Sequence, residues 1–438
     1  MAFSFRGGIH PPMHKELTEN CAFLPPVECS VFRLSLSQHI GAPAIAAVSA
    51  GDSVKKGQLI GRPAHGSSAP VHSPVSGKVL AIENRHNLFG ELSPPDVIEN
   101  DFKEEEDYLP PLVNPTKEQA IARITETGIV GMGGAGFPTA AKLNFPVETL
   151  VINAAECEPY LTCDYRLILE KTTEFLRGVD YLKLATGATR ALICVENNKT
   201  AAIKEVEKAG VPLVRFRKQT EGVGTYLVPL KTKYPQGSEK QIIYSATGKE
   251  VPEGALPSSL GIAVYNAHTA FSVYEAIALG KPLIERYMTL SGSAAKNPCN
   301  LLVKIGTPFS LLAEKCAASN TRMVVSGGPM MGFCAVSGEV CTKKTSGSLL
   351  FFKEEEVTPA PVGACIGCGR CVSVCPMRLM PVLIDQYARA GNLKEAARYG
   401  APQCMECGSC SYVCPAKRPL MQSIRGTKKK LREEKKRG

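Results

Sequence analysis

The sequence predicts a multidomain α/β protein with a metal-binding, cysteine-rich segment near its C-terminal end. Three observations predict this class: short β patterns broken by Gly, Ser and Pro in residues 1–92, alternating helix and strand patterns in residues 116–290, and eight of the 17 cysteines within residues 365–414. A chain of 438 residues has room for several domains, and 44% hydrophobic with 21% charged residues is an ordinary globular composition.

Residues 1–92 contain two similar halves, AIAAVSAGDSVKKGQLIG and APVHSPVSGKVLAIE, each running from a small-residue strand through a Gly turn to a second strand. This pattern resembles the biotinyl/lipoyl-type barrel-sandwich domains. That family carries its cofactor on a hairpin lysine, and the matching stretch AHGSSAPVH has none. We therefore expect a structural or docking version of this domain.

Residues 93–115 follow as a linker with five prolines and the acidic run ENDFKEEED. Because prolines stiffen a linker and like charges extend it, we expect a solvated connector. An ordered wrap across a neighbouring surface is the alternative.

Residues 116–290 alternate helical and strand patterns. KEQAIARITETG and KTAAIKEVEKAG have helical periodicity, whereas VETLVINAAE, ALICVEN and VPLVRFR are typical of strands. This order predicts a Rossmann-like α/β domain with a largely parallel sheet. Residues 291–350 are compact and strand-rich (LLVKIGTPFSLLAEKC, then MVVSGGPMMG), and their pattern resembles a ligand-binding β-grasp module.

Residues 360–425 contain two copies of the motif C-x2-C-x2-C-x3-C-P. Three thiolates at two-residue gaps can bind one corner of a cubane, and in two-cluster ferredoxins the fourth cysteine ligates the other cluster. The spacing predicts an α-helical ferredoxin-type domain with two [4Fe–4S] clusters; zinc knuckles are the alternative, but they use a wider gap between ligand pairs. The predicted ligands are Cys365, Cys368, Cys371 and Cys414 for cluster 1, and Cys404, Cys407, Cys410 and Cys375 for cluster 2.

The end of the chain carries most of the net charge of +10, because residues 425–438 contain eight Lys or Arg and two Glu. The remainder is nearly neutral, which excludes a nucleic-acid-binding face over the whole protein. We expect the basic tail, residues 426–438, to be solvated; contact with an anionic membrane surface or an acidic redox partner is the alternative.

Hydropathy and cysteine usage bear on the compartment. The first residues lack the apolar stretch of a secretory signal, and no window holds about 18 uncharged apolar residues, so we expect no membrane-spanning segment. An odd number of cysteines favours a reducing cytoplasm with metal-bound thiolates over a secreted disulfide framework.

A glycine-rich stretch, GMGGAGFPTAAK, spans residues 131–142. Gly131, Gly133 and Gly136 satisfy G-x-G-x-x-G, but they follow a helical pattern and precede a proline, which disfavours a classical dinucleotide fingerprint. So many glycines indicate close backbone approach to a flat or anionic ligand, with Lys142 available for a phosphate. A tight turn without a ligand is the alternative.

The same stretch resembles the flavin loop of the NADH- and FMN-binding subunit of respiratory complex I and its relatives. Three further segments resemble elements of that family: NAAECEP at residues 153–159, YPQGSE at residues 234–239, and NAHT at residues 266–269. The resemblance implies that FMN and NAD(H) bind at Gly131, Gly133, Gly134, Gly136, Phe137, Lys142, Asn153, Glu156, Glu158, Tyr234, Gly237, Glu239, Asn266 and Thr269.

Roles follow from the same resemblance. Asn153 and Glu156 would face FMN, Glu158 would face the nicotinamide nucleotide, and Phe137 would stack near the nicotinamide or serve as a core or lid residue. Ala155 and Ser238 replace acidic residues of that family, so part of the flavin contacts would be missing or supplied otherwise. No general acid or base is assigned, because the flavin carries the chemistry.

The whole chain, from the opening FRGGIHPP through the cysteine motifs, resembles the C-subunit family of the membrane-bound Rnf complexes, which are ion-pumping ferredoxin:NAD oxidoreductases. The resemblance implies a peripheral protein on the cytoplasmic face of the membrane, held there by the other subunits of the complex. Electrons from ferredoxin would arrive through those subunits, cross the two clusters and FMN, and reduce NAD.

Two alternatives belong to different classes. One is a soluble flavin and iron–sulfur reductase, such as a cobalamin reductase or a hydrogenase module. The other is a non-catalytic docking and relay protein whose flavin site has decayed, which Ala155 and Ser238 would suggest.

Overall fold

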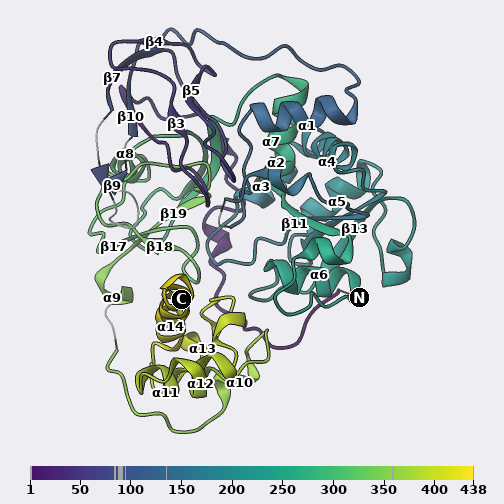
Figure 1. Cartoon of the computed structure of the whole chain (residues 1–438), viewed down its shortest axis with the longest axis vertical. Coiled ribbons are helices and arrows are strands. Elements are labelled where there is room, and N and C mark those ends of the chain that lie inside the picture. Colours follow the sequence, from purple (N-terminus) through teal and green to yellow (C-terminus); the bar gives the residue numbers. More distant parts are fainter. Residues whose placement is uncertain are drawn as a thin grey trace.

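The computed structural model describes residues 2–82, 85–86, 92–93, 95–134, 136–357 and 360–437 (Figure 1). Pro94 of the predicted linker lies outside the described residues. The chain forms an N-terminal β domain, a central α/β domain, a mixed-sheet domain and a C-terminal helical domain, which confirms the predicted multidomain α/β class.

The N-terminal β domain is built from two small sheets and a two-stranded ribbon, with strand orders β2-β10-β7-β4, β3-β5-β6 and β8-β9. Alternating side chains such as Phe32, Leu34 and Ile60 fill the space between the sheets. The strands are β2 (Val31–Ser35), β3 (Ile45–Ala46), β4 (Ser53–Val54), β5 (Leu59–Arg62), β6 (Val71–His72), β7 (Gly77–Ile82), β8 (Arg85–His86), β9 (Leu92–Ser93) and β10 (Pro95–Asn100).

The segment predicted as a linker is only partly a connector. Strand β10 lies between β2 and β7 and pairs antiparallel with both. Val97 and Ile98 are both buried, at a register shift in the β10–β7 pairing. The sequence analysis missed this short strand because the segment is rich in proline and acidic residues.

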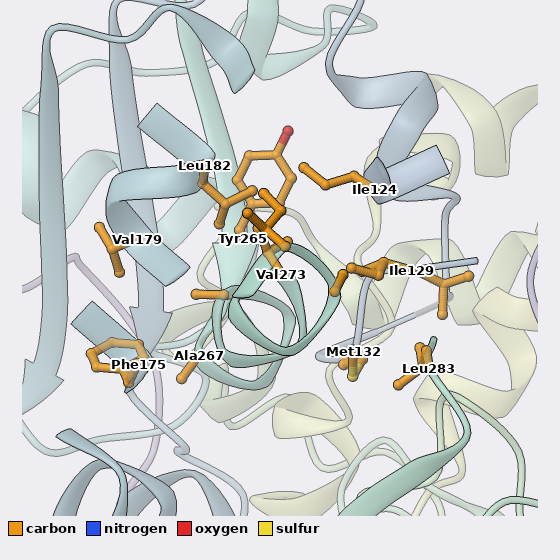
Figure 2. Close-up of a cluster of buried hydrophobic side chains, with 14 of the residues drawn as sticks. Ile124, Ile129, Met132, Phe175, Val179, Leu182, Tyr265, Ala267, Val273 and Leu283 are labelled. Carbon is orange, nitrogen blue, oxygen red and sulfur yellow. The ribbon is translucent and has the colours of Figure 1, made fainter. Parts of the chain in front are cut away.

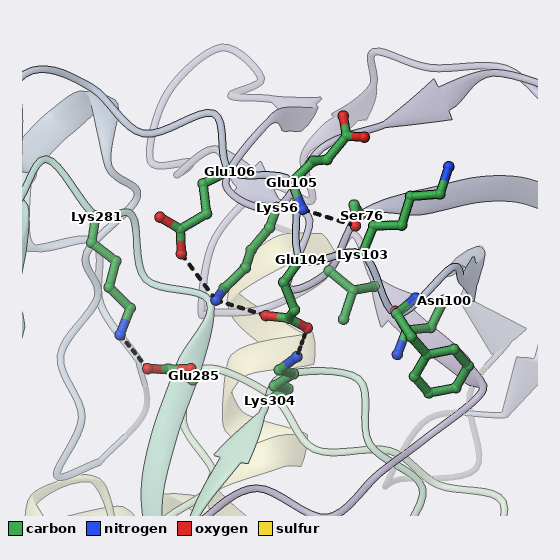
Figure 3. Close-up of polar contacts among 12 residues, drawn as sticks. Lys56, Ser76, Asn100, Lys103, Glu104, Glu105, Glu106, Lys281, Glu285 and Lys304 are labelled. Atoms are coloured by element: carbon green, nitrogen blue, oxygen red, sulfur yellow. Dashed lines mark hydrogen bonds and ion pairs between the residues drawn. The ribbon is translucent and has the colours of Figure 1, made fainter.

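The acidic run after β10 is an ordered wrap and not a solvated connector. Lys56 of the β domain lies 2.8 Å from Glu104, and Glu104 also pairs with Lys304 of the mixed sheet (Figure 3). Further along, the Leu109 N–H donates to the Gly280 carbonyl at 3.1 Å. The expected mutual repulsion of the acids is thus offset by lysines on two neighbouring domains.

The central α/β domain has a parallel four-stranded sheet in the order β13-β12-β11-β14. The strand expected at residues 211–217 is reduced to a single bridge at Leu213, because the chain then turns through a 3-10 helix (Arg217–Thr220). The elements are α1 (Lys117–Glu126), α2 (Thr139–Lys142), β11 (Thr149–Ala154), α3 (Cys163–Glu170), α4 (Thr172–Thr186), β12 (Arg190–Glu196), α5 (Thr200–Lys208), β13 (Gly224–Leu230), α6 (Glu239–Thr247), a 3-10 helix (Pro257–Leu260), β14 (Ile262–Asn266) and α7 (Ala267–Ala278).

Helix α7 is apolar on almost every side and lies in the centre of this domain, where α1, α4 and the loop after α1 surround it (Figure 2). It approaches α4 so closely that a Cβ on Gly178 would lie 1.9 Å from the Ala270 carbonyl oxygen. This tight packing fixes Asn266 and Thr269 at the start of α7.

The mixed-sheet domain has six strands in the order β1-β16-β15-β19-β17-β18. It extends beyond the predicted residues 291–350, because β15 (Glu285–Ser291) pairs with both β16 and β19, and β1 (Phe23–Leu24) comes from the N-terminal segment. The remaining elements are β16 (Cys299–Lys304), α8 (Phe309–Lys315), β17 (Met323–Ser326), β18 (Phe333–Cys334) and β19 (Ser348–Phe352).

The C-terminal domain is helical, as predicted. Its elements are α9 (Glu354–Val357), α10 (Arg370–Ser373), α11 (Pro381–Arg389), α12 (Leu393–Arg398), a 3-10 helix (Ala401–Gln403), α13 (Ser409–Tyr412) and α14 (Leu420–Arg437). Residues 426–437 of the basic tail belong to α14, and they are anchored because the Lys428 ammonium lies 2.6 Å from both a Glu406 carboxylate oxygen and the Cys404 carbonyl oxygen. Among the described residues, no helix is both long and apolar enough to cross a membrane.

Candidate functional site

The glycine loop connects α1 to α2, and the structure describes its residues 128–134 and 136–137. Its two sides are joined because the Gly131 N–H donates to the Phe137 carbonyl at 2.9 Å. The loop is tied to α7 because the Met132 N–H donates to Thr269 Oγ1 at 3.1 Å. The Phe137 side chain is 38% exposed, so it lies at the rim of the loop and not in the core.

Two glycines bring the loop backbone close to its surroundings. A Cβ on Gly133 would lie 3.1 Å from the Asn266 Cβ, and one on Gly136, where φ is +76°, would lie 2.5 Å from Thr345 Cγ2. Gly134 differs, because a Cβ there would meet no described residue within 4 Å. Gly133 and Gly134 are both exposed, so the loop presents bare backbone to a ligand.

Two asparagines stand at the carboxyl ends of adjacent parallel strands, which is where open α/β sheets bind ligands. Asn153, near the end of β11, donates through Nδ2 to the Gly237 carbonyl at 2.7 Å. Asn266 ends β14, donates through Nδ2 to an Asp164 oxygen at 2.9 Å, and caps α7 by accepting from the His268 N–H.

Lys142 and Glu239 lie side by side at the same edge of the sheet. The Lys142 ammonium donates to the Val264 carbonyl at 3.3 Å and lies 3.7 Å from a Glu239 carboxylate oxygen. Glu239 opens α6, and the Lys142 side chain is 30% exposed. The lysine therefore keeps an accessible positive charge beside the glycine loop.

The acidic turn, residues 155–161, brings two carboxylates under this edge. Glu156 is buried with φ at +48°, and its Oε1 accepts from the Asp164 N–H at 2.6 Å. Glu158 is half-buried, and its Oε2 accepts from the Met330 N–H at 3.0 Å. The second oxygen of each carboxyl group finds no partner among the described residues. Burial raises the pKa of each to about 7.

We expect the Glu158→Gln substitution to stabilise the flavin-free chain at neutral pH. Since the pKa of Glu158 is raised to about 7, the folded state favours the protonated form and loses stability as pH rises from about 4.5 to 7. Glutamine has no such proton to release, and its oxygen can still accept from the Met330 N–H. The gain in unfolding free energy should be near zero at about pH 4.5 and grow to about 2 kcal/mol above pH 7.

Denaturant unfolding of both proteins across this pH range measures the difference. A gain that stays constant, or that falls with rising pH, would contradict a raised pKa at Glu158.

Tyr234 connects the acidic turn to the cysteine-rich domain. The side chain is 1% exposed, and its hydroxyl donates to the Cys407 carbonyl at 2.7 Å. Gly237, three residues on, donates its N–H to the Cys157 sulfur at 3.3 Å. Tyr234 also shares a buried cluster with Cys157 of the acidic turn and with Cys407, so it links the acidic turn to the cysteine-rich domain.

The two cysteine motifs meet in one pocket. Its cysteines are Cys375, Cys404, Cys407 and Cys410, and apolar side chains such as Leu379, Met405 and Ile424 line the rest. Backbone N–H groups of Leu379 and Glu406 point at the sulfurs of Cys375 and Cys404, both at 3.4 Å. The structure thus gathers one cysteine of the first motif with three of the second.

The other four predicted cluster ligands include the two most exposed cysteines of the two motifs. Cys365 and Cys368 are exposed, and Cys371 and Cys414 are partly buried. Cys365 and Cys368 of the first motif therefore lie at the surface, whereas Cys375 of the same motif lies in the pocket that Met405, Met421 and Ile424 also line.

Several site residues were missed by the motifs. Asp164 and His268 form a buried pair, Nδ1 to Oδ1 at 2.5 Å, which holds Asn266 against the glycine loop. The ammonium groups of Lys15 and Lys199 bind carbonyls of the acidic turn. Lys199 follows a predicted strand, which is a weak signal. Lys15 lies three residues after the opening FRGGIHPP and far from the flavin and cysteine motifs, so its place in this site had no signal in the sequence.

Three family models match the chain in separate regions. An RnfC barrel sandwich hybrid domain matches residues 3–103, a Nuo51 FMN-binding domain matches residues 124–275, and a 4Fe-4S dicluster domain matches residues 362–415. The matches agree with the predicted barrel-sandwich, flavin and two-cluster domains. Fold and site together define a protein that joins an FMN-binding domain to a two-cluster iron–sulfur domain.

Comparison with curated proteins identifies the family within this class. The chain is 39% identical to the C-subunit of the Na(+)-translocating ferredoxin:NAD(+) oxidoreductase complex of Acetobacterium woodii, over 99% of this chain and 98% of the relative. It is 40% identical to the proton-translocating counterpart of Clostridium ljungdahlii (99% and 95%) and to the C-subunit of the ion-translocating oxidoreductase complex of Rhodobacter capsulatus (99% and 84%). The chain belongs to the C-subunit family of these Rnf complexes.

Among solved structures, a NAD+-reducing [NiFe]-hydrogenase in the air-oxidised state shares the fold, with a TM-score of 0.50 and 18% identity. The likeness covers 71% of this chain and 63% of that chain. At this identity it bears on the fold alone.

Proposed function

We propose that the chain is an electron-transfer component of a membrane-bound, ion-translocating ferredoxin:NAD oxidoreductase. The observation that carries this proposal is the contact of Tyr234 with Cys407, because it joins the acidic turn of the flavin domain directly to the cysteine pocket. When bound, FMN would exchange a hydride with NAD(H) and single electrons with two [4Fe–4S] clusters. The names of the curated relatives support ferredoxin as the indirect electron donor.

The residues around the glycine loop fit a flavin mononucleotide. Exposed backbone at Gly133 and Gly134 suits a flat ring system, and the accessible ammonium of Lys142 suits a phosphate. The unpartnered carboxyl oxygens of Glu156 and Glu158 are buried acceptors or donors that a ligand could satisfy. Glu158 and Phe137 would then contact the nicotinamide nucleotide.

The cysteines would hold two clusters in a fixed order. The pocket of Cys375, Cys404, Cys407 and Cys410 suits a cubane, since soft thiolates, an apolar lining and N–H groups aimed at sulfur stabilise such clusters. This cluster would lie on the flavin side, beside Tyr234. The cluster of Cys365, Cys368, Cys371 and Cys414 would lie on the outer side, where a partner protein could deliver electrons.

The remaining domains would serve assembly. The domain boundaries, the β-grasp identity of the mixed sheet and the docking role of the β domain are part of this proposal. The hairpin of β15 and β16, followed by α8 and β19 parallel to β15, supports the β-grasp identity. The chain would sit peripherally on the cytoplasmic face of the membrane, held by the other subunits of the complex.

An anaerobic titration with NADH tests the proposal. We expect less than one equivalent of NADH to bleach a bound flavin and to generate EPR signals of two interacting [4Fe–4S] centres. Co-purification with integral membrane proteins separates a component of a membrane complex from a soluble reductase. Clusters without extractable FMN and without a response to NADH would leave only the relay function.

A further inference from the structure

The N-terminal segment, residues 2–24, runs from beside α6 past the C-terminal domain to the centre of the molecule (Figure 1). On its way the Gly8 N–H donates to the Val374 carbonyl, next to the cluster ligand Cys375, and Ile9 exchanges backbone hydrogen bonds with Tyr234. The segment then reaches the acidic turn, where the Tyr160 N–H donates to the Met13 carbonyl at 2.7 Å.

Lys15 of this segment is enclosed by the acidic turn. The residue is 6% exposed, and its ammonium donates to the carbonyls of Glu156, Glu158 and Leu161 at 2.8, 3.0 and 2.5 Å. An ammonium has three N–H donors and no acceptor, so these three bonds use its full capacity. A buried charge satisfied only by backbone carbonyls of one turn is costly to place elsewhere, which makes the contact specific.

Lys199 approaches the same turn from the start of α5. Its ammonium donates to the Ala155 carbonyl at 2.7 Å and lies 3.5 Å from a Glu196 carboxylate oxygen. Lys199 is buried, and so is Glu196. Two ammonium groups that are far apart in the sequence therefore bind carbonyls of the turn that carries Glu156 and Glu158.

The backbone of the acidic turn needs such support. Glu156 and Tyr160 adopt positive φ values of 48° and 70°, which side-chain-bearing residues rarely adopt. The carbonyls that would normally pair in a sheet or helix converge instead on the two lysines. Without the ammonium groups, four buried or partly buried carbonyls, those of Ala155, Glu156, Glu158 and Leu161, would lose a charge-assisted partner.

We infer that Lys15 and Lys199 are positioning residues for the nicotinamide and flavin site: they hold the acidic turn in its strained shape and place two positive charges beneath it. This inference rests on the proposed function, because it assigns the turn to that site. Two buried positive charges would also favour a site that accepts electrons, and would raise the midpoint potential of the bound flavin.

The test compares Lys15→Met and Lys199→Met with a matched control, Lys233→Met. Lys233 is buried like the other two lysines. Its ammonium donates to the Phe5 and Gly7 carbonyls of the N-terminal segment instead of to the acidic turn. The first measurement is amide hydrogen exchange of residues 155–161 in the cluster-containing chain without flavin. The second is the midpoint potential of the flavin after reconstitution with FMN.

We expect Lys15→Met to speed exchange across residues 155–161 by about tenfold or more, which is the equilibrium equivalent of one lost charge-assisted hydrogen bond. We expect its flavin potential to become more negative, and the KM for NADH to rise. Lys199→Met should change the same quantities in the same direction, so it serves if Lys15→Met does not fold. Lys233→Met should change the thermal unfolding midpoint without changing the exchange or the potential.

The inference would be overturned if Lys15→Met, Lys199→Met and Lys233→Met all showed the same amide exchange rate in residues 155–161 and the same flavin midpoint potential. The lysines would then have only a general structural role. If the unaltered chain takes up no FMN, the proposed function fails instead. The exchange experiment still decides in that case whether the lysines position the turn, since it uses the chain without flavin.

Discussion

Replacing Cys375 with serine is expected to remove the cluster whose other ligands, Cys404, Cys407 and Cys410, belong to the second cysteine motif. The four cysteines line one pocket, and a hydroxyl is a harder and weaker ligand for iron than a thiolate. Half of the iron should be lost. Reduction of the flavin by NADH should persist, whereas transfer to an external one-electron acceptor should fall to the background rate, because we propose that the lost cluster lies on the flavin side, beside Tyr234.

Two double variants test crossed ligation through the iron content alone, without any spectrum. With crossed ligands, Cys371→Ser combined with Cys375→Ser disrupts both clusters, and nearly all iron should be lost. Cys375→Ser combined with Cys410→Ser disrupts only one cluster, and half of the iron should remain. The reverse result would mean that each motif binds its own cluster, and the proposed order of electron carriers would then need revision.

Substituting Gly134 with alanine is expected to leave the fold intact and to abolish tight flavin binding. The new Cβ would meet no described residue within 4 Å, so the unfolding free energy should change by less than about 0.5 kcal/mol. Since the exposed backbone here is proposed to contact FMN, the added methyl group should weaken binding by at least about tenfold. Fluorescence titration of the flavin-free chain with FMN measures the affinity.

Two other glycines provide the comparison. Gly426 lies inside α14 and also has open space around its Cβ, so Gly426→Ala should raise the unfolding free energy by up to about 1 kcal/mol through helix propensity and leave the flavin affinity unchanged. Gly133→Ala should lower both, because its Cβ would lie 3.1 Å from the Asn266 Cβ. An affinity of Gly134→Ala equal to that of the unaltered chain would mean that FMN does not lie on this face of the loop.

Short sequence patterns were enough to predict most of the fold class and the kinds of ligand that the protein would bind. The two C-x2-C-x2-C-x3-C-P motifs predict iron–sulfur ligation because ligand spacing is a property of a few consecutive residues. The same holds for the parallel strands, whose short apolar runs alternate with helical periods, and for the glycine loop. At β13 this reasoning was wrong, because Gly224–Leu230 forms the strand that was expected at residues 211–217.

Composition misled the prediction in the linker. Prolines and acids suggested an extended connector, yet Val97 and Ile98 supply enough apolar surface for a central strand, and Glu104 finds lysines on two other domains. Composition averages over a segment, whereas pairing depends on individual residues and on which partners the fold brings near. The docking of the basic tail on the C-terminal domain likewise involves the contacts of Lys428 with Glu406 and Cys404.

By itself, the sequence determined which residues are able to bind iron, a flavin and a phosphate, because the residue types and their spacing can be read from short stretches of consecutive residues. Only the tertiary structure decided that Val97 and Ile98 belong to a central strand of the β domain, and that Lys15 lies inside the acidic turn. Both facts depend on contacts between residues far apart in the chain. Such contacts are fixed by how whole domains pack and bury charge, which no short pattern records.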